Sequence, residues 1–215
     1  CKTNKVKAVG LADSYNLCGA LEFAEKVAKV GTQPIIGTQI NVLCENQIGK
    51  ITLYATSEKG FKNLTKLSSK SYLKNEISHE PCCLIEDLIS NSDDLILLTG
   101  NYFNFFGKLF YANKLKLFEK LLNKLQISFN NRLYIEIQRH SENQEINYEN
   151  YLLKIASLFD LPIIASQEIY YISPDMAEAH DALICIGEKR FVDDQSRFRY
   201  SNEHYLKNNK DLQKL

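Results

Sequence analysis

The sequence lacks an excess of charge of either sign. Its 215 residues include 26 Lys and Arg against 26 Asp and Glu, so the formal net charge is zero. A domain that grips nucleic acid by itself usually carries a clear basic excess. The balance therefore argues against a primary DNA-binding surface, although it leaves room for local basic patches.

Long apolar runs and paired cysteine motifs are also missing. No apolar run approaches the 18 residues of a membrane-spanning helix, and the polar start of the chain does not read as a signal peptide. The six cysteines include adjacent Cys82 and Cys83 but no Cys-x-x-Cys pair, which excludes zinc-ribbon spacing. We expect a cytoplasmic protein with reduced cysteines and no membrane partner. Glycine-rich phosphate-binding loops and legible Ser-His-Asp or Cys-His arrangements are absent too.

What the sequence does contain is a repeated order of strand and helix. Apolar runs predict strands over 6–11, 34–42, 51–55, 95–99, 133–137 and 161–166. Helical spacing of apolar residues predicts helices over 18–30, 58–72, 84–89, 113–126, 148–159 and 175–186. This order predicts an α/β fold, either a barrel or a doubly wound sheet. Because the composition turns polar and aromatic from Phe191 onward, we place one domain at 1–190 and a linker at 191–215.

The most informative stretch is Val9–Phe23. An apolar run ends there in a small polar turn that carries Asp13, and a helix then begins. In α/β enzymes the reactive groups lie at the carboxyl ends of the strands, so this turn is a candidate site. It contains one acid and no histidine.

Four stretches, in this order and spacing, resemble one family. They are Leu11–Phe23, Gln33–Gly37, Gly60–Leu64, and Leu161–Ala165 followed by Glu178–Asp181. Together they resemble the PHP (polymerase and histidinol phosphatase) domain at the N-terminus of the bacterial DNA polymerase III alpha subunit. The resemblance covers essentially the whole chain, and the tail around Tyr205–Lys207 fits the stretch that leads into the polymerase body.

The resemblance implies a distorted (β/α)7-type PHP barrel, here without the family's first strand-helix unit. In active members three metals lie at the carboxyl ends of the strands, where histidines and carboxylates hold them and the metals activate water against a phosphoester. The family's opening His-x-His pair has no match before Val6.

Four further positions depart from the family's metal-binding pattern. Ser14 stands where active members carry the histidine of Thr-Asp-His, and Gln39 replaces a glutamate. Lys50 falls near a histidine position, and Tyr170 replaces the histidine of Asp-x-His. A serine hydroxyl is a poor divalent ligand, an amide lacks the charge, and a lysine repels metal. We therefore expect no resident cofactor and no catalytic residue in this chain, with Zn or Mn present only if the site is active.

Three vestigial ligand positions remain, and each has a purely structural alternative. Asp13 could be a turn or helix-capping carboxylate. His140 could be a loop histidine in a polar turn, and Glu168 a strand-end acid paired with a nearby Lys or Arg. Because three weak ligands beside a lysine do not hold three metals, we expect an inactive phosphoesterase site.

Other candidates outside that pattern are weaker. We expect a structural role for His180, which lies inside a predicted helix, and an exposed position for His79. The aromatic run Asn101–Phe106 could form a base-stacking platform. The interpretation we favour is an aromatic loop that fills the barrel floor or packs on a neighbouring domain.

Three functions from different classes follow. The first is a non-catalytic scaffold in a replicative polymerase, which docks the proofreading exonuclease subunit and the remaining polymerase III alpha domains. The second is an active metal-dependent phosphoesterase or 3′–5′ exonuclease, and the third a stand-alone enzyme similar to histidinol phosphatase. The departures at the ligand positions favour the first. On that interpretation the DNA-directed DNA polymerase activity belongs to a later domain, and DNA is contacted through the whole polymerase.

Overall fold

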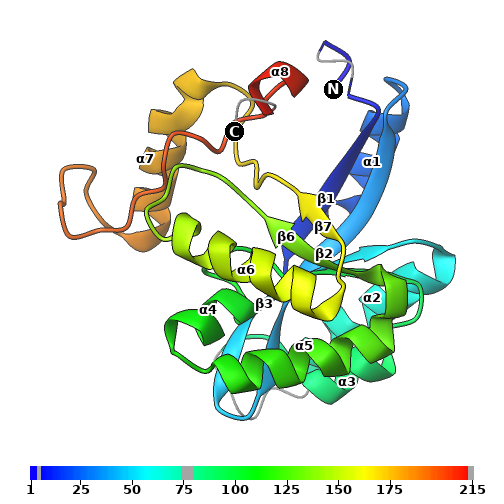
Figure 1. The fold of residues 1–215 in the computed structure, drawn as a ribbon. Coiled ribbons are helices and arrows are strands. Elements are labelled where there is room, and N and C mark those ends of the chain that lie inside the picture. The colour runs from blue at the N-terminus through cyan, green and yellow to red at the C-terminus, as the bar shows by residue number, and fades with distance from the viewer. Residues whose placement is uncertain (4–5, 74–79, 213–215) are drawn as a thin grey trace.

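A curled mixed sheet forms the centre of the molecule (Figure 1). The computed structural model describes residues 1–3, 6–73 and 80–212. Its seven strands are β1 (Ala8–Ser14), β2 (Gln33–Cys44), β3 (Gln47–Ala55), β4 (Cys82–Leu84), β5 (Leu95–Leu98), β6 (Leu133–Ile137) and β7 (Ile163–Ala165). The order across the sheet is β1-β2-β3-β5-β6-β7, and β4 pairs with a later part of β2 than β1 does. All strands run parallel except β3, which is antiparallel to β2 and β5.

Helices surround this sheet. They are α1 (Ala20–Ala28), α2 (Glu58–Leu73), α3 (Ile85–Ser90), α4 (Phe105–Tyr111), α5 (Leu115–Phe129), α6 (Glu145–Phe159), α7 (Ala177–Glu188) and α8 (Asn209–Leu212), with short 3₁₀ turns η1 (Asn130–Arg132) and η2 (Pro174–Met176). Figure 1 shows α3 and α5 at one end of the molecule and α7 with α8 at the other. Among the described residues, no helix is both long and apolar enough to cross a lipid bilayer.

One apolar core joins the sheet to α2 through α6. Helix α5 shows how the sequence builds it: its apolar residues recur every three or four positions, so one face is apolar along the whole helix. That face is buried at Phe118, Leu121, Leu122, Leu125 and Phe129. The polar remainder of α5, including Lys120 and Lys124, stays on the outer side.

The α/β class and the strand-helix order expected from the sequence are confirmed, with local differences. The short strand β4 before α3 was not predicted. Residues 101–106 are not a continuous aromatic loop, because Phe105 and Phe106 begin α4 and are fully buried. The strands predicted over 34–42 and 51–55 extend to meet in a tight hairpin. The direction of the second of these strands, which periodicity alone does not decide, is antiparallel to the first.

Gly37 on β2 allows a close approach that the sequence indicated. A Cβ at this position would lie 2.4 Å from the carbonyl oxygen of Leu53 and 2.5 Å from Cδ1 of Tyr54. Real Cβ atoms do not approach other heavy atoms this closely, so only glycine fits without movement of the backbone. The Tyr54 ring therefore packs directly against the backbone of β2 at Gly37.

The C-terminal stretch packs along the domain. Arg197 forms a buried ion pair with Asp181 of α7. Tyr205 forms a parallel bridge with Tyr171, next to which the Leu206 amide donates to the Tyr171 carbonyl at 3.0 Å. The boundary between a domain and a linker near residue 190 stays a prediction.

Candidate functional site

Polar side chains gather where the parallel strands end, as expected for the site of an α/β barrel. Ser14 is the last residue of β1 and lies opposite Gln39 of β2, while Lys50 on the antiparallel β3 lies opposite Asn41. Asn101 follows β5 after a short turn. At the other end of the strand order, β6 supplies Glu136, the residue after β6 supplies Gln138, and the segment after β7 supplies Ser166 and Glu168.

One half of this cluster connects β3 to the segment after β7. The Lys50 ammonium donates to Ser14 Oγ at 3.0 Å, and Ser14 Oγ donates to Gln39 Oε1 at 3.3 Å. The amide nitrogen of Gln39 then donates to Glu168 Oε1 at 3.3 Å. A cation, a hydroxyl and an amide thus form a continuous path to the Glu168 carboxylate.

The other half begins at the second oxygen of Glu168. Asn101 Nδ2 donates to Glu168 Oε2 at 3.3 Å and to Gln138 Oε1 at 3.2 Å. Gln138 Nε2 donates to Glu136 Oε1 at 3.0 Å and to Ser166 Oγ at 3.2 Å, and the Ser166 hydroxyl also donates to Glu136. We call the eight residues of both halves the strand-end network: Ser14, Gln39, Lys50, Asn101, Glu136, Gln138, Ser166 and Glu168.

Glu136 is the most deeply buried acid of the network, with 4% of its surface exposed. Burial raises the pKa of its carboxyl above the ordinary value, and the nearby Glu168 charge raises it further. Burial also raises the pKa of the Tyr54 phenol to about 12, with contributions from Glu136 and Glu168. The inner end of the network therefore favours neutral, hydrogen-bonded groups over charges.

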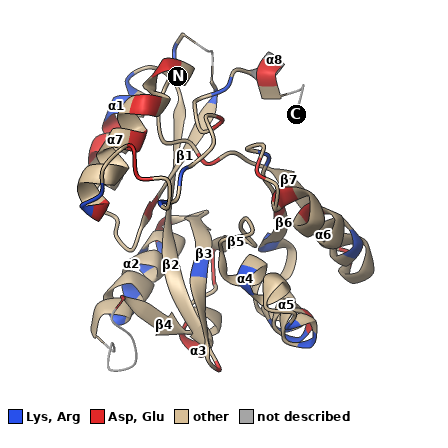
Figure 2. Ribbon diagram, turned by 90° about the vertical axis from the view of Figure 1, so that its left-hand side faces the viewer, with Lys and Arg blue, Asp and Glu red and all other residues tan. Residues whose placement is uncertain are grey.

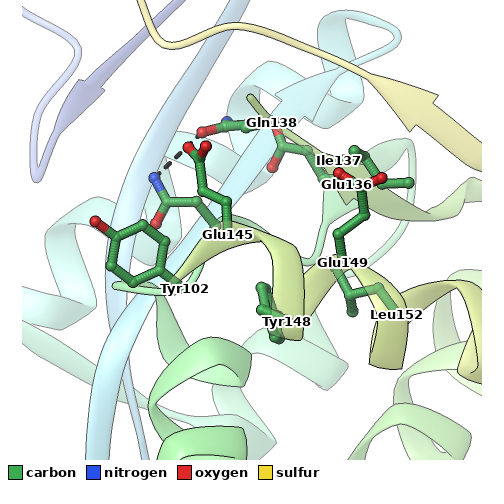
Figure 3. Close-up of a pocket in the computed structure, with 9 residues that line it drawn as sticks. Tyr102, Glu136, Ile137, Gln138, Glu145, Tyr148, Glu149 and Leu152 are labelled. Carbon is green, nitrogen blue, oxygen red and sulfur yellow. Dashed lines mark hydrogen bonds between the residues drawn. The ribbon is translucent and has the colours of Figure 1, made fainter. Parts of the chain in front are cut away.

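The space beside Glu136 is small. Figure 3 shows the pocket that Glu136 and Gln138 line together with Glu145 and Tyr148 of α6. Its volume is about 10 Å³, which corresponds to about one water molecule. The pocket can hold a buried solvent molecule, but it has no room for a substrate or a group of metals.

We expect Glu136 to make the stability of the protein depend on pH. A carboxyl whose pKa is raised by folding holds its proton more tightly in the folded state than in the unfolded chain, where the value is near 4.5. Its contribution is therefore complete below about pH 4.5 and is lost as the pH rises through the folded pKa, at about 1.4 kcal/mol per pKa unit. Urea unfolding of the wild type and of Glu136→Gln between pH 4 and pH 8 measures this, because the variant lacks the titration. Parallel pH profiles for the two proteins would contradict the assignment.

The structure does not bring the three vestigial ligand positions, Asp13, His140 and Glu168, together. Glu168 lies in the network, and its partners are amides instead of the Lys or Arg of its structural alternative. Successive side chains of a strand point to opposite faces, so Asp13 points away from its neighbour Ser14. The Asp13 carboxylate lies beside Gly19 at the start of α1, where a Cβ would stand 3.0 Å from Oδ2. Residue 19, and not Asp13, is the N-cap of α1.

His140 lies apart from the network, in a buried stack with a residue that the sequence did not single out. Glu145 binds its backbone N–H at 2.8 Å and its ring Nδ1 at 3.3 Å. The His140 ring stacks on the His204 ring with centroids 4.1 Å apart. His204 is also buried, and its Nδ1 lies 3.1 Å from the Glu168 carbonyl oxygen. Burial, reinforced by neighbouring His140, lowers the pKa of His204 to about 4.

The remaining aromatic and histidine candidates lie around this stack. Tyr170 stacks on His204 at 4.9 Å and on His180 at 5.0 Å, so it fills space between the C-terminal segment and α7. These contacts agree with a structural role for His180. His79 lies outside the described residues. Within residues 1–3, 6–73 and 80–212, no group of three or more His, Cys, Asp or Glu side chains could hold a metal ion.

Several network members carried no recognisable signal in the sequence. Glu136 and Gln138 sit in and just after a predicted strand, and Asn101 belongs to a run singled out for its aromatics. Alternation along β6 would have placed Glu136 and Gln138 on one face, since they are two residues apart. The pairing of that face with Asn101 and Ser166 depends on contacts between distant segments.

Comparisons with known proteins agree with this architecture. The family model described as "PHP domain" matches residues 1–140. A DNA polymerase III subunit alpha from Caulobacter vibrioides is 34% identical over 219 residues, which cover 98% of this chain and 19% of that protein. The corresponding subunits of Rickettsia bellii and Thermus aquaticus are 35% and 28% identical over 98% and 97% of this chain. The chain spans about a fifth of the length of these relatives.

A comparison with solved structures gives a more distant likeness. A provisionally assigned metal-dependent phosphoesterase from Bifidobacterium adolescentis has a TM-score of 0.45 and 12% sequence identity to this chain. The match covers 77% of this chain and 78% of that one.

Proposed function

This chain belongs to the PHP domain family, and we propose that it is the PHP domain of a DNA polymerase III alpha subunit and acts as a scaffold instead of a phosphoesterase. The similarity to curated alpha subunits over nearly all of the chain supports its place in such a polymerase. On this proposal the parent protein is a nucleotidyltransferase of the cytoplasm, and the polymerase active site lies in another domain.

The strand-end network is the observation that carries the scaffold role. Both oxygens of Glu168 accept hydrogen bonds from amide nitrogens, and the Lys50 ammonium of the same network donates to Ser14. A divalent metal needs free anionic oxygens or imidazole nitrogens at these places. Lys50 would instead repel a metal, so these residues do not fit the three-metal centre of active family members.

The proposal gives the network a structural purpose. It joins β1, β2 and β3 to the residues that follow β5, β6 and β7, so the two halves of the curled sheet are connected at the strand ends. A satisfied polar network rigidifies the segments that it connects. A rigid barrel end suits a domain that holds other polypeptides, and the proofreading exonuclease subunit and the remaining alpha-subunit domains are the partners we assign to it.

Metal content and hydrolysis test the loss of catalysis. We expect protein purified without chelators to contain no stoichiometric Zn or Mn by mass spectrometry, and to show no turnover of an aryl phosphate or of the 3′ end of an oligonucleotide. The Lys50→Met variant, which removes the cation but none of the acids, is expected to stay inactive. Two or three tightly bound metals per chain together with phosphoester turnover would replace the scaffold with an active phosphoesterase.

Capture of the exonuclease subunit tests the scaffold role directly. The exonuclease subunit of the same organism should be retained by the immobilised chain and should elute with it in size-exclusion chromatography. An immobilised chain unfolded in urea is the control for non-specific retention. Failure of the folded chain to retain the exonuclease removes the docking role, whatever the metal analysis finds.

A further inference from the structure

Helix α7 packs on the domain by one side and carries apolar residues on the opposite side. Its inner side packs on the domain through buried Cys185, through Asp181 paired with Arg197, and through His180 stacked on Tyr170. Its outer side carries Ala179, Leu183 and Ile186, and Met176 of η2 extends the same line at helical spacing. An apolar stripe along a helix normally packs against another element.

The outer side of α7 is nevertheless exposed. Leu183 is 65% exposed, Ile186 is 75% exposed, and Phe191 just beyond the helix is 81% exposed. The acids of α7, which Figure 2 shows in red, are Glu178, Asp181 and Glu188. At 100° per residue these acids fall outside the arc that contains Ala179, Leu183 and Ile186. We call Met176, Ala179, Leu183, Ile186, Phe191 and Val192 the α7 face.

Exposed apolar residues are frequent in the part of the chain that contains this face. Among the described residues, eleven of the 24 large apolar side chains that are exposed lie between Ile163 and Phe198. Helices α2 and α6 expose three each, at Phe61, Tyr72 and Leu73 and at Ile146, Leu153 and Leu158, whereas five lie within residues 176–192. Contiguous apolar patches on a single domain mark surfaces that another protein segment covers.

We propose that the α7 face is an interdomain interface, covered by the part of the polymerase alpha chain that lies outside the region matched here. This inference rests on the proposed function. About four-fifths of each curated relative lies outside the matched region, so ample polypeptide exists to cover the face. The Arg197–Asp181 pair holds the C-terminal segment against α7. A domain linked through that segment is therefore present at high effective concentration near the α7 face.

Cysteine labelling of the long chain tests the interface. Leu183→Cys and the control Ile127→Cys place thiols at positions that are 65% and 77% exposed in this domain. Each variant is labelled with a maleimide in the 215-residue chain and in the full polymerase alpha chain. Mass spectrometry of the digested protein then measures labelling of the introduced cysteine separately from labelling of the native cysteines. We expect Cys at 183 to react at least tenfold more slowly in the full chain, and Cys at 127 to react equally in both. Equal rates at 183, or protection at both positions, overturn the proposal.

A second measurement distinguishes a second copy of this chain as the occupant. The 215-residue chain should sediment as a monomer at micromolar concentration, and the double variant Leu183→Glu with Ile186→Glu should sediment identically. A dimer that this double variant dissociates would overturn the interdomain assignment. Template-directed DNA synthesis by the full chain tests the proposed function separately. Absence of synthesis would contradict the proposed function, whereas lack of protection at residue 183 would contradict only the interface.

Discussion

Replacing Phe106 by alanine is expected to lower the free energy of unfolding by about 3–5 kcal/mol. Phe106 is fully buried at the start of α4, and its ring contacts those of Phe105 at 5.5 Å and Phe118 of α5 at 4.8 Å. Alanine removes most of a large apolar side chain from the centre of the core and leaves a cavity that the surrounding helices cannot fill. Urea unfolding at pH 7 measures the effect.

The matched control lies three residues away. Phe103 is 44% exposed, so Phe103→Ala should cost less than about 1 kcal/mol, as is usual for a surface substitution. This pair also decides between the two interpretations of the aromatic run. If Phe106→Ala kept its stability but lost affinity for a single-stranded oligonucleotide, the run would be a base-stacking platform and its assignment to the core would be wrong.

Periodicity predicted the elements whose burial follows a simple local pattern. Helix α5 is one example, because the spacing of its apolar residues matches the face that the structure buries. The start of α4 was missed because Phe103 to Phe106 is aromatic without a helical period, and the burial of Phe105 depends on β3. A Cβ at Gly49 of β3 would lie 2.6 Å from the Phe105 Cα, a closeness that no local pattern reveals.

The site was predictable in part. Ser14, Gln39, Lys50 and Glu168 were selected together because the family carries ligands at those positions, and the structure joins them by hydrogen bonds. Asp13 was selected with them, although strand alternation places it on the other face from Ser14. Whether these residues have lost all metal binding stays a prediction that the metal analysis decides.

His204 could not be found from the sequence for a different reason. It is a single histidine in a polar tail, where nothing nearby in the chain indicates burial. Its environment comes from two distant segments: the ring of His140 after β6, and the Tyr170 ring with the Glu168 carbonyl after β7. Such a residue becomes recognisable only when the tail is seen to lie across the ends of β6 and β7.

Acidification is expected to weaken the protein through His204. Its imidazole has a pKa of about 4 in the folded protein, compared with 6.5 ordinarily, because burial and the adjacent His140 oppose the charged form. The unfolded chain therefore binds a proton more readily than the folded protein between these values. The contribution of His204 is complete above about pH 6.5 and is lost as the pH falls through about 4.

The expected loss between pH 7 and pH 4 is about 3 kcal/mol, since one pKa unit corresponds to about 1.4 kcal/mol. Urea unfolding of the wild type and of His204→Phe at pH 7, 5.5 and 4.5 isolates this term. Phenylalanine keeps a ring to stack on His140 and Tyr170 but cannot bind a proton, so the variant should lose less stability on acidification. As the pH is lowered, the amides of residues 199–207 should lose protection from hydrogen exchange at a higher pH in the wild type than in the variant. This segment responds because the Tyr170 amide donates to the His204 carbonyl and joins it to the domain. An equal acid-induced loss in both proteins would assign the effect to Glu145 and the other acids whose pKa is lowered by folding, and would contradict a role for His204.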